Sequence, residues 1–119
     1  MKPTKTTLKR KADGLWSRAI RDRDGRCMAA DYWPDIRCAG SLQAMHLIPR
    51  MYLSTRWEMW NGAAGCGAHH TFLTHRPLEH AYFCRLILGA KDYERRARAA
   101  RAAHGSPDYQ AIIDRLEAA

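Results

Sequence analysis

The chain has 119 residues, of which 46% are hydrophobic and 27% are charged, and its formal net charge is +8 at pH 7. This length fits one domain, the composition excludes wholesale disorder, and no stretch approaches the roughly 18 apolar residues of a membrane span. The positive charge favours a polyanionic partner, with nucleic acid ahead of an anionic membrane.

The N-terminal residues 1–12 are strongly basic and carry no apolar stretch behind them. They are therefore no signal peptide, and without export we expect a cytoplasmic protein. We interpret them either as a mobile arm that lies along phosphates or as a solvated tail. The first helix is predicted over 13–23, with Asp13 as its cap and Gly25 at its end.

The middle of the chain predicts a small β-structure. Residues 26–40 are irregular and need something to order them, and a metal would do so. A strand is predicted over 42–48, and Pro49 ends it. Residues 52–57 could form a short second strand or an extended loop, whereas 61–67 have the small, glycine-rich composition of a tight loop.

The C-terminal half predicts helices. One begins near Cys66, and another spans 77–88, where apolar residues on most sides favour deep burial. An Ala/Arg-rich helix over 91–104 is basic on one side. A last helix is expected to open at Ser106, with an apolar stripe that docks on the rest of the fold.

Cys66 and His69 form a C-x2-H pair at the start of a predicted helix, close enough to bind one tetrahedral zinc. Cys27 and Cys38 bracket the irregular segment and would complete a Cys3His site. Ten residues separate them, more than in usual zinc pairs, so the alternative is that both are small buried residues. In the cytosol structural disulfides are rare, and Cys84 is expected to be a core thiol.

Three further polar residues stand out by their spacing. Fourteen residues separate His46 from Asn61, and eight separate Asn61 from His70. Phosphodiester hydrolysis needs an activated water and a cation near the phosphate. A neutral imidazole can be the base near pH 7, a second imidazole can bind a divalent ion, and an asparagine can either bind that ion or hold a loop in shape.

The segment M-H-L-I-P-R, followed by T-R-W-E-M-W-N-G-A-A-G-C-G-A-H-H, resembles the motif of the HNH endonuclease family. The downstream P-L-E-H and Y-E-R-R resemble phage-encoded HNH proteins of the NinG-like recombination group. The likeness covers roughly 15–98. It implies an α+β fold with a ββα-metal (HNH) core and a structural zinc, flanked by an N-terminal helix and C-terminal helices. The expected organisation is a basic flexible arm (1–12), a nuclease domain (13–90) and a helical extension packed on it (91–119).

The resemblance also implies roles for individual residues. His46 is the general base that activates water, His70 is a ligand of a catalytic Mg²⁺ or another divalent ion, and Asn61 is either a ligand of that ion or the residue that fixes the loop. The structural zinc positions fall on Cys27, Cys38, Cys66 and His69.

The chain departs from the family pattern at Met45, where the family usually has Asp or His. A thioether binds a hard cation poorly, so a normal ligand is missing. His75, Glu58 or a water could replace it, and the NinG-like proteins also tend to lack an acid there.

The sequence thus predicts a metal-dependent endonuclease that nicks double-stranded DNA with little sequence specificity, in a bacterial host cell if it is phage-encoded. Arg50 and Arg56 lie near the base and are candidates for phosphate contacts, although either could be a surface charge. Two alternatives stay open: a non-catalytic, zinc-stabilised DNA-binding module, and a structure-selective nuclease acting on recombination intermediates. No membrane partner is expected, and the oligomeric state is not determined by the sequence.

Overall fold

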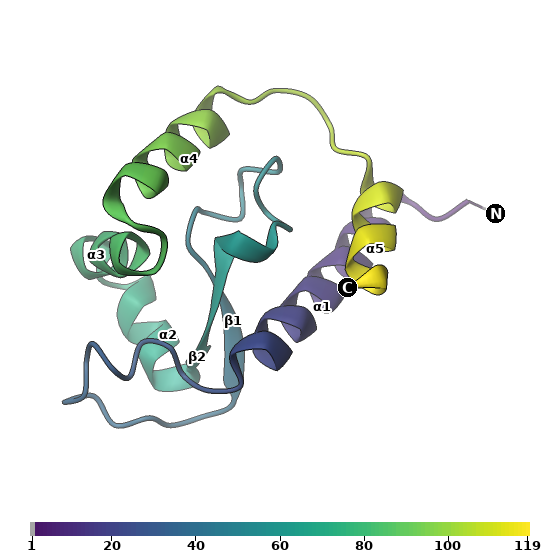
Figure 1. Ribbon diagram of the computed structural model, residues 1–119. Helices are drawn as coiled ribbons and strands as arrows, with labels where there is room; N and C mark the ends of the chain where they lie inside the picture. Colours follow the sequence, from purple (N-terminus) through teal and green to yellow (C-terminus); the bar gives the residue numbers. More distant parts are fainter. Residues whose placement is uncertain (1) are drawn as a thin grey trace.

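The computed structural model describes residues 2–119, and within them the chain forms an α+β fold with five α-helices and one two-stranded antiparallel sheet (Figure 1). The α+β prediction is confirmed. The elements are α1 (Lys5–Asp24), β1 (Leu42–His46), the 3-10 helix η1 (Met59–Asn61), β2 (Gly62–Cys66), α2 (Gly67–Thr74), α3 (Pro77–Leu88), α4 (Ala90–Ala102) and α5 (Tyr109–Ala118). No helix in this part of the chain has the length and apolar character needed to span a membrane.

The N-terminal helix α1 begins at Lys5 rather than at Asp13, so most of the predicted flexible arm is helical. Thr4 caps this helix because its side-chain oxygen accepts a hydrogen bond from the backbone N–H of Thr7 at 3.1 Å. Ala12 is fully buried in the core that α1 shares with α5. Packing against a helix that is distant in sequence therefore extends α1, and local sequence signals do not contain that information.

Strand β2 occupies the segment that was predicted to be a tight loop, and the alternative second strand at 52–57 is wrong. Every residue of β2 is buried. A Cβ atom at Gly62 would lie 2.5 Å from the Trp16 side chain, and one at Gly65 would lie 2.5 Å from the Met45 side chain. The small residues of β2 therefore make room for two large side chains that cover the sheet.

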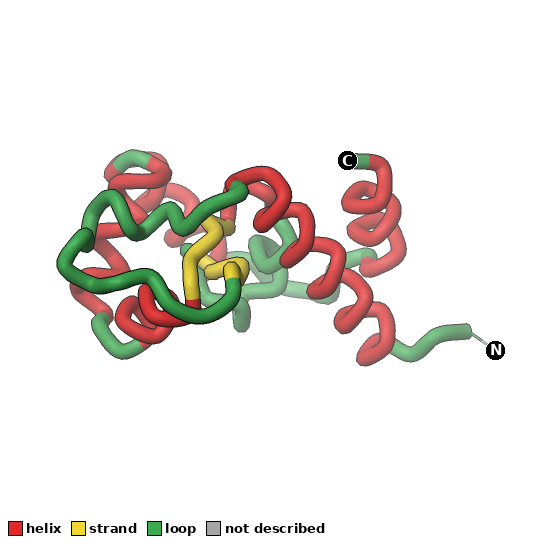
Figure 2. Tube along the Cα trace, turned by 90° about the horizontal axis from the view of Figure 1, so that it is seen from below, coloured by secondary structure: helices red, strands yellow, loops and turns green. Residues whose placement is uncertain are grey.

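The register of the sheet places two candidate sites at opposite ends. His46, the last residue of β1, pairs with Gly62, whereas Leu42 at the start of β1 pairs with Cys66. The chain then passes from Cys66 directly into α2. The long connection over 25–41 lies on the side of the molecule away from both termini (Figure 2).

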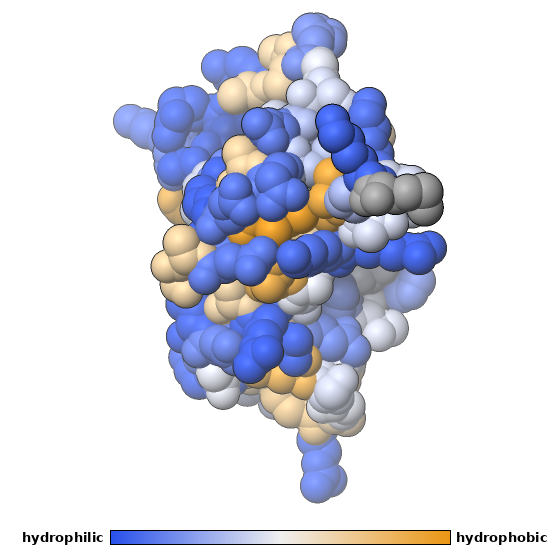
Figure 3. Space-filling model, turned by 90° about the vertical axis from the view of Figure 1, so that its right-hand side faces the viewer, coloured by the Kyte–Doolittle hydropathy of each residue, from blue (hydrophilic) through white to orange (hydrophobic). Residues whose placement is uncertain are grey.

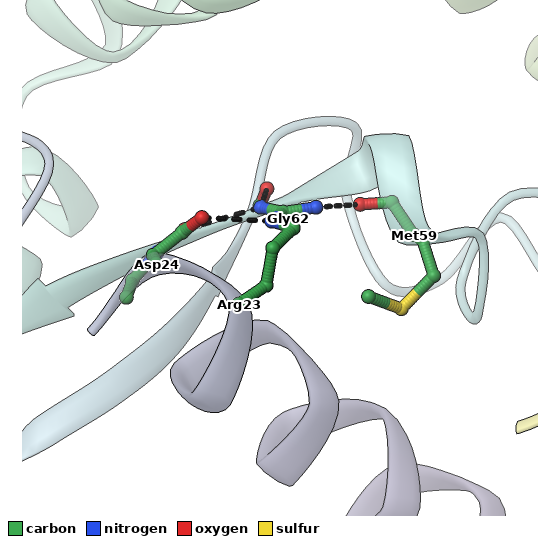
Figure 4. A network of polar contacts seen from close by, with 5 residues as sticks. Arg23, Asp24, Met59 and Gly62 are labelled. Atoms are coloured by element: carbon green, nitrogen blue, oxygen red, sulfur yellow. Dashed lines mark hydrogen bonds and ion pairs between the residues drawn. The ribbon is translucent and has the colours of Figure 1, made fainter. Parts of the chain in front are cut away.

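The C-terminal end of α1 is bonded to the start of β2 (Figure 4). The Arg23 guanidinium donates to the carbonyl oxygens of Met59 at 2.6 Å and Gly62 at 2.7 Å. The carboxylate of Asp24 accepts a hydrogen bond from the backbone N–H of Ala64 at 2.8 Å. These bonds fix α1 across the sheet, and α1 in turn positions the side chains that it places beside His46.

Helix α3 has the predicted bounds but not the predicted burial. Phe83 and Cys84 are fully buried, whereas Leu78 is 83% exposed and Tyr82 is 56% exposed. The expectation of deep burial is wrong, because only part of the surface of α3, including Phe83 and Cys84, packs on the core.

The last helix, α5, begins at Tyr109 rather than at Ser106. Asp108 caps it by accepting a hydrogen bond from the backbone N–H of Ala111 at 3.0 Å. The predicted apolar stripe does dock: Tyr109 and Ile113 are buried against α1, and the Tyr109 ring meets Trp57 edge-on at 5.6 Å.

Candidate functional site: a cysteine–histidine cluster and a histidine cleft

The four residues predicted to bind zinc meet at the start of α2. The sulfur atoms of Cys27, Cys38 and Cys66 and a ring nitrogen of His69 all lie within 4.8 Å of one another. His69 Nδ1 is 3.1 Å from Cys66 Sγ and 3.6 Å from Cys38 Sγ. Ligand atoms around a tetrahedral zinc lie about 3.6 to 3.8 Å apart, so this group could hold a metal ion with only small adjustments.

Hydrogen bonds orient the His69 ring toward the sulfur atoms. The ring is fully buried, and its Nε2–H donates to the carbonyl oxygen of Trp33 at 3.0 Å. This bond fixes the tautomer in which Nδ1 keeps its lone pair and faces Cys66. Cys66 is the N-cap of α2, and its sulfur accepts a hydrogen bond from the backbone N–H of His69 at 3.4 Å.

The thiols of the cluster differ in acidity. Burial raises the pKa of Cys66, but hydrogen bonds to its sulfur, above all from the backbone N–H of His69, outweigh burial and bring this pKa down to about 6. The pKa of Cys38 is raised to about 11 by its hydrogen bond to Cys66 and by burial. Metal ligation requires thiolates, and Cys66 is already close to that state. Cys84 lies apart from this group as a buried core thiol, as predicted.

A second site lies at the other end of β1, where a cleft of about 630 Å³ opens between α1, β1, α2 and α3. It brings His46 and His70 to one space, as the sequence predicted for a catalytic pair. Asn61 does not line it. A third imidazole, that of His80 on α3, does.

His46 is held as a neutral base. Its Nε2–H donates to the carbonyl oxygen of Arg56 at 2.9 Å, and its ring stacks on Trp16 with the centroids 4.1 Å apart. This tautomer leaves a lone pair on Nδ1. Burial is the main cause that lowers the pKa of His46, and the guanidinium groups of Arg56 and Arg50 act in the same direction, whereas the bond to the Arg56 carbonyl opposes them.

His70 is oriented in the complementary way. Its Nδ1–H donates to the side-chain oxygen of Gln43 at 2.6 Å, which leaves the lone pair on Nε2. Burial, and secondly the nearby His80, lower the pKa of His70. Sequence analysis missed Gln43, for which the only signal is a polar side chain within a predicted strand. An acceptor on the far nitrogen is typical of histidines that bind metal.

Asn61 is fully buried, and its side chain forms hydrogen bonds with the backbone of the loop that precedes it. Its side-chain oxygen accepts from the backbone N–H of Ile48 at 2.7 Å, and its amide group donates to the carbonyl oxygens of Ile48 at 3.1 Å and Thr55 at 3.0 Å. Of the two predicted roles, this geometry fits the fixing of the loop. The role of Asn61 as a metal ligand is corrected, because its oxygen and nitrogen are already bonded.

Arg50 and Arg56, the two arginines predicted to contact phosphates, differ in burial and in their partners. Arg56 is 9% exposed and forms a two-point bond with the Asp13 carboxylate at 3.0 and 2.7 Å, so its predicted phosphate contact is corrected to an internal ion pair. Trp57 also donates to Asp13, at 2.8 Å. The side chain of Arg50 is 68% exposed, lines the cleft and lies 3.8 Å from Asp13, so it can reach a phosphate.

Met45, which stands where the resemblance would lead one to expect a metal ligand, is a buried side chain, 3% exposed, that covers the sheet. Neither suggested replacement lines the cleft: Glu58 pairs with Arg115 at 3.5 Å, and His75 is exposed at the end of α2. His80, which sequence analysis left without a role, does line it, and its Nε2–H donates to the His46 carbonyl oxygen at 3.1 Å.

The two sites therefore offer different chemistry: a closed set of four ligands, and an open space lined by three imidazoles, of which His46 and His70 have lowered pKa values. Searches against protein-family models, curated proteins and solved structures gave no match. Function must be inferred from the geometry of the two sites.

Proposed function

We propose that the chain is a metal-dependent DNA endonuclease that nicks duplex DNA with little sequence specificity. The observation that carries this proposal is the setting of His46, a neutral histidine with one nitrogen bonded to a backbone carbonyl and its ring stacked on Trp16 at the wall of a cleft. The succession of β1, β2 and α2, with His46 and His70 facing one cleft, supports the resemblance to HNH nucleases.

In this proposal His46 is the general base. Its Nδ1 takes a proton from a water molecule, and the water oxygen forms a bond to phosphorus in line with the departing 3′ oxygen. The bond from phosphorus to that oxygen breaks as the new bond forms. The bond from His46 Nε2–H to the Arg56 carbonyl keeps the ring in the reactive tautomer and stabilises the positive charge that the ring acquires.

The cysteine–histidine cluster fits a structural zinc. Three sulfur ligands and one imidazole form a closed tetrahedral set, and soft thiolates favour zinc over magnesium or calcium. Bound there, zinc would join the connection over 25–41 to the start of α2. It would thereby also hold His70, which directly follows the zinc ligand His69 on α2.

The cleft does not fit Mg²⁺. This ion prefers oxygen ligands, and the carboxylate that lines the cleft, that of Asp13, is already bonded to Arg56 and Trp57. Since His46 Nδ1 takes the proton from water in this proposal, the nitrogen that would bind the ion is His70 Nε2, and imidazole nitrogen suits zinc or nickel. Bound to His70, such an ion would stabilise negative charge on the departing oxygen.

The test is nicking of supercoiled plasmid by zinc-loaded protein with added Mg²⁺, Mn²⁺, Ni²⁺ or Zn²⁺. We expect nicking that EDTA blocks, strongest with the imidazole-binding ions. His46→Ala should lower it by at least ~100-fold, the usual contribution of a general base, with DNA binding retained. His75→Ala is the matched control, because His75 is exposed outside the cleft. Nicking by His46→Ala at the rate of this control would overturn the proposal.

A second candidate is a non-catalytic, zinc-stabilised DNA-binding module. The observation that favours it is the burial of Met45 at a position that would otherwise supply a metal ligand. This candidate predicts salt-dependent DNA binding with no EDTA-sensitive nicking under any of the four ions.

A further inference from the structure

One face of α1 adjoins the cleft and combines arginines with small residues. Arg10, Gly14, Ser17 and Arg21 recur at i, i+4, i+7 and i+11, so they share one side of the helix. Ser17 lines the cleft, which makes this α1 stripe continuous with it. The side of the molecule formed by α1 and α5 is largely covered by hydrophilic side chains (Figure 3).

The charges of the α1 stripe are available to a ligand. Among residues 2–119, Arg10 takes part in none of the ion pairs, and Arg21 only donates to the backbone oxygen of Ser17 in its own helix, at 3.3 Å. Both are exposed. On α4, Arg95 and Arg96 are both paired with Asp92. Arg98 and Arg101, by contrast, take part in none of the ion pairs among residues 2–119 and therefore offer a matched set of free charges.

Gly14 has no packing function within the fold. It lies in the interior of α1 and is exposed, and a Cβ atom built there would meet nothing within 4 Å. Glycine is less favourable than alanine inside a helix, so this position lowers helix stability for no internal contact. The missing side chain at Gly14 does, however, leave space between Arg10 and Arg21, and such space lets the sugar–phosphate backbone of a nucleic acid approach the helix closely.

We infer that the α1 stripe binds the phosphodiester backbone of duplex DNA and directs one strand across the cleft to His46. Trp16, on the same helix, stacks on His46, so α1 fixes the distance between the bound backbone and the base. At a rise of 1.5 Å per residue, Arg10 and Arg21 are about 16 Å apart, which spans several phosphates of one strand. Binding of DNA by the stripe does not depend on the proposed nuclease activity; only the statement that the bound strand is cut at His46 rests on it.

The first test compares two double variants that remove the same charge. Arg10→Gln/Arg21→Gln removes both ends of the α1 stripe, and Arg98→Gln/Arg101→Gln removes two exposed arginines of α4. Anisotropy titrations of a labelled duplex across salt should show that the α1 variant binds about tenfold more weakly, with the salt slope reduced by about 1.8, because each phosphate that is no longer neutralised reduces it by about 0.9. The α4 variant should stay within about twofold of the wild type. Equal weakening in the two variants would overturn the inference.

The second test uses Gly14. Gly14→Ala should raise the melting temperature, because alanine favours the helix and the space is open. Gly14→Gln should fold equally well yet weaken DNA binding several-fold, whereas Ala99→Gln on the exposed face of α4 should not. Unchanged binding by Gly14→Gln would exclude a close approach at this position and overturn the inference.

These outcomes separate the stripe from the proposed function. If the wild type nicks plasmid with none of the four ions, and Arg10→Gln/Arg21→Gln still loses DNA binding, the stripe is supported and the nuclease is rejected. Normal binding and nicking by this variant supports the nuclease and rejects the stripe. Tighter binding to an RNA duplex than to the same DNA sequence would overturn DNA as the occupant.

Discussion

His69 and His70 are neighbours on α2, yet they belong to regions of opposite design. His69 is fully buried, and its free nitrogen meets sulfur ligands within 4.8 Å. His70 faces a cleft of about 630 Å³, and in the described part of the chain its free nitrogen belongs to no comparable set of ligands. A closed set of protein ligands is typical of structural metal sites, whereas an open position is what a reactive site needs.

The two regions also use their hydrogen bonds differently. In the cluster, the bond from His69 to Trp33 turns the ring toward ligands that are already present. In the cleft, the bonds from His46 to Arg56 and from His70 to Gln43 leave one nitrogen of each ring without a hydrogen-bond partner among residues 2–119. The first arrangement suits a metal ion that would stabilise the fold, and the second leaves donor atoms available to a ligand.

The largest effect should come from removing one ligand of the cysteine–histidine cluster. Cys66→Ser removes the thiol whose pKa is lowered to about 6, and the serine oxygen can still cap α2, so the variant tests the metal ligand rather than the cap. Structural zinc contributes about 10 kcal/mol or more of folding free energy in small domains, so this variant should be unfolded or insoluble. The wild type should contain close to one zinc per chain and lose its cooperative melting transition when a strong chelator removes it.

Cys84→Ala is the matched control, since Cys84 is a buried thiol outside the cluster. It should keep the zinc and lose only the stability expected for a small core change. Metal analysis giving less than ~0.2 zinc per chain in the wild type would show that the cluster is not a structural zinc site.

The next effect in size should come from Asn61, which the structure assigns to the loop rather than to a metal. Asn61→Ala leaves the Ile48 N–H and two carbonyl oxygens without their partner, and we expect a loss of about 2 to 4 kcal/mol of stability. Chemical denaturation measures it.

Asn61→Asp sharpens the result, because a carboxylate would improve a metal ligand but cannot donate to Ile48 and Thr55. The loop role predicts that this variant is also destabilised, with no gain in metal affinity. A variant that is stable and binds a divalent ion more tightly would restore the ligand role.

Some site residues could be predicted from the sequence, whereas the burial of Asn61 could not. The Cys3His group was predictable because liganding residues keep their chemistry wherever the chain places them. The same reasoning placed His46 and His70 at one cleft. It could not tell that Asn61 and Arg56 are buried, since both are polar types that occur more often at surfaces.

Strand β2 was missed for a related reason. Gly62 and Gly65 indicate a turn when neighbours along the chain are considered alone, but they provide space for Trp16 and Met45, which arrive from other elements. Local patterns therefore predicted the start of α2 and both ends of α3 and α4 to within two residues. They failed where a contact distant in sequence decides the structure, as it also does for the N-terminal turns of α1.

A smaller effect is expected from Gln43, which orients His70. Gln43→Leu removes the acceptor for His70 Nδ1–H and should weaken binding of Ni²⁺ or Zn²⁺ at the cleft by about 10- to 100-fold, the usual effect of losing such a partner. Calorimetric titration of protein whose cluster is already loaded with zinc measures it. Gln43→Glu keeps an acceptor oxygen and should restore most of the affinity, whereas equal weakening by both variants would assign Gln43 a packing role only.

The smallest effect should appear in the dependence of nicking on pH. A base must be neutral to accept a proton, and burial holds the pKa of His46 below its usual 6.5. Nicking should therefore stay nearly constant from neutral pH down to about 6.5 and fall only as the pH drops further through this lowered pKa, whereas an ordinary histidine would lose about half its activity at pH 6.5.

Folding stability should change in the same pH range. Since the folded state holds the His46 proton less tightly than the unfolded state, the stabilisation from its neutral form is fully present above pH 6.5 and is lost as the pH falls through the lowered pKa. His46→Ala should therefore show a shallower loss of stability below pH 6.5 than the wild type does. The comparison must use zinc-loaded protein, because acid also protonates the thiolates of the cluster and this loss is common to both proteins. A nicking midpoint at or above pH 6.5, or identical stability slopes in the two proteins, would show that His46 is not the buried neutral base that distinguishes the cleft from the cluster.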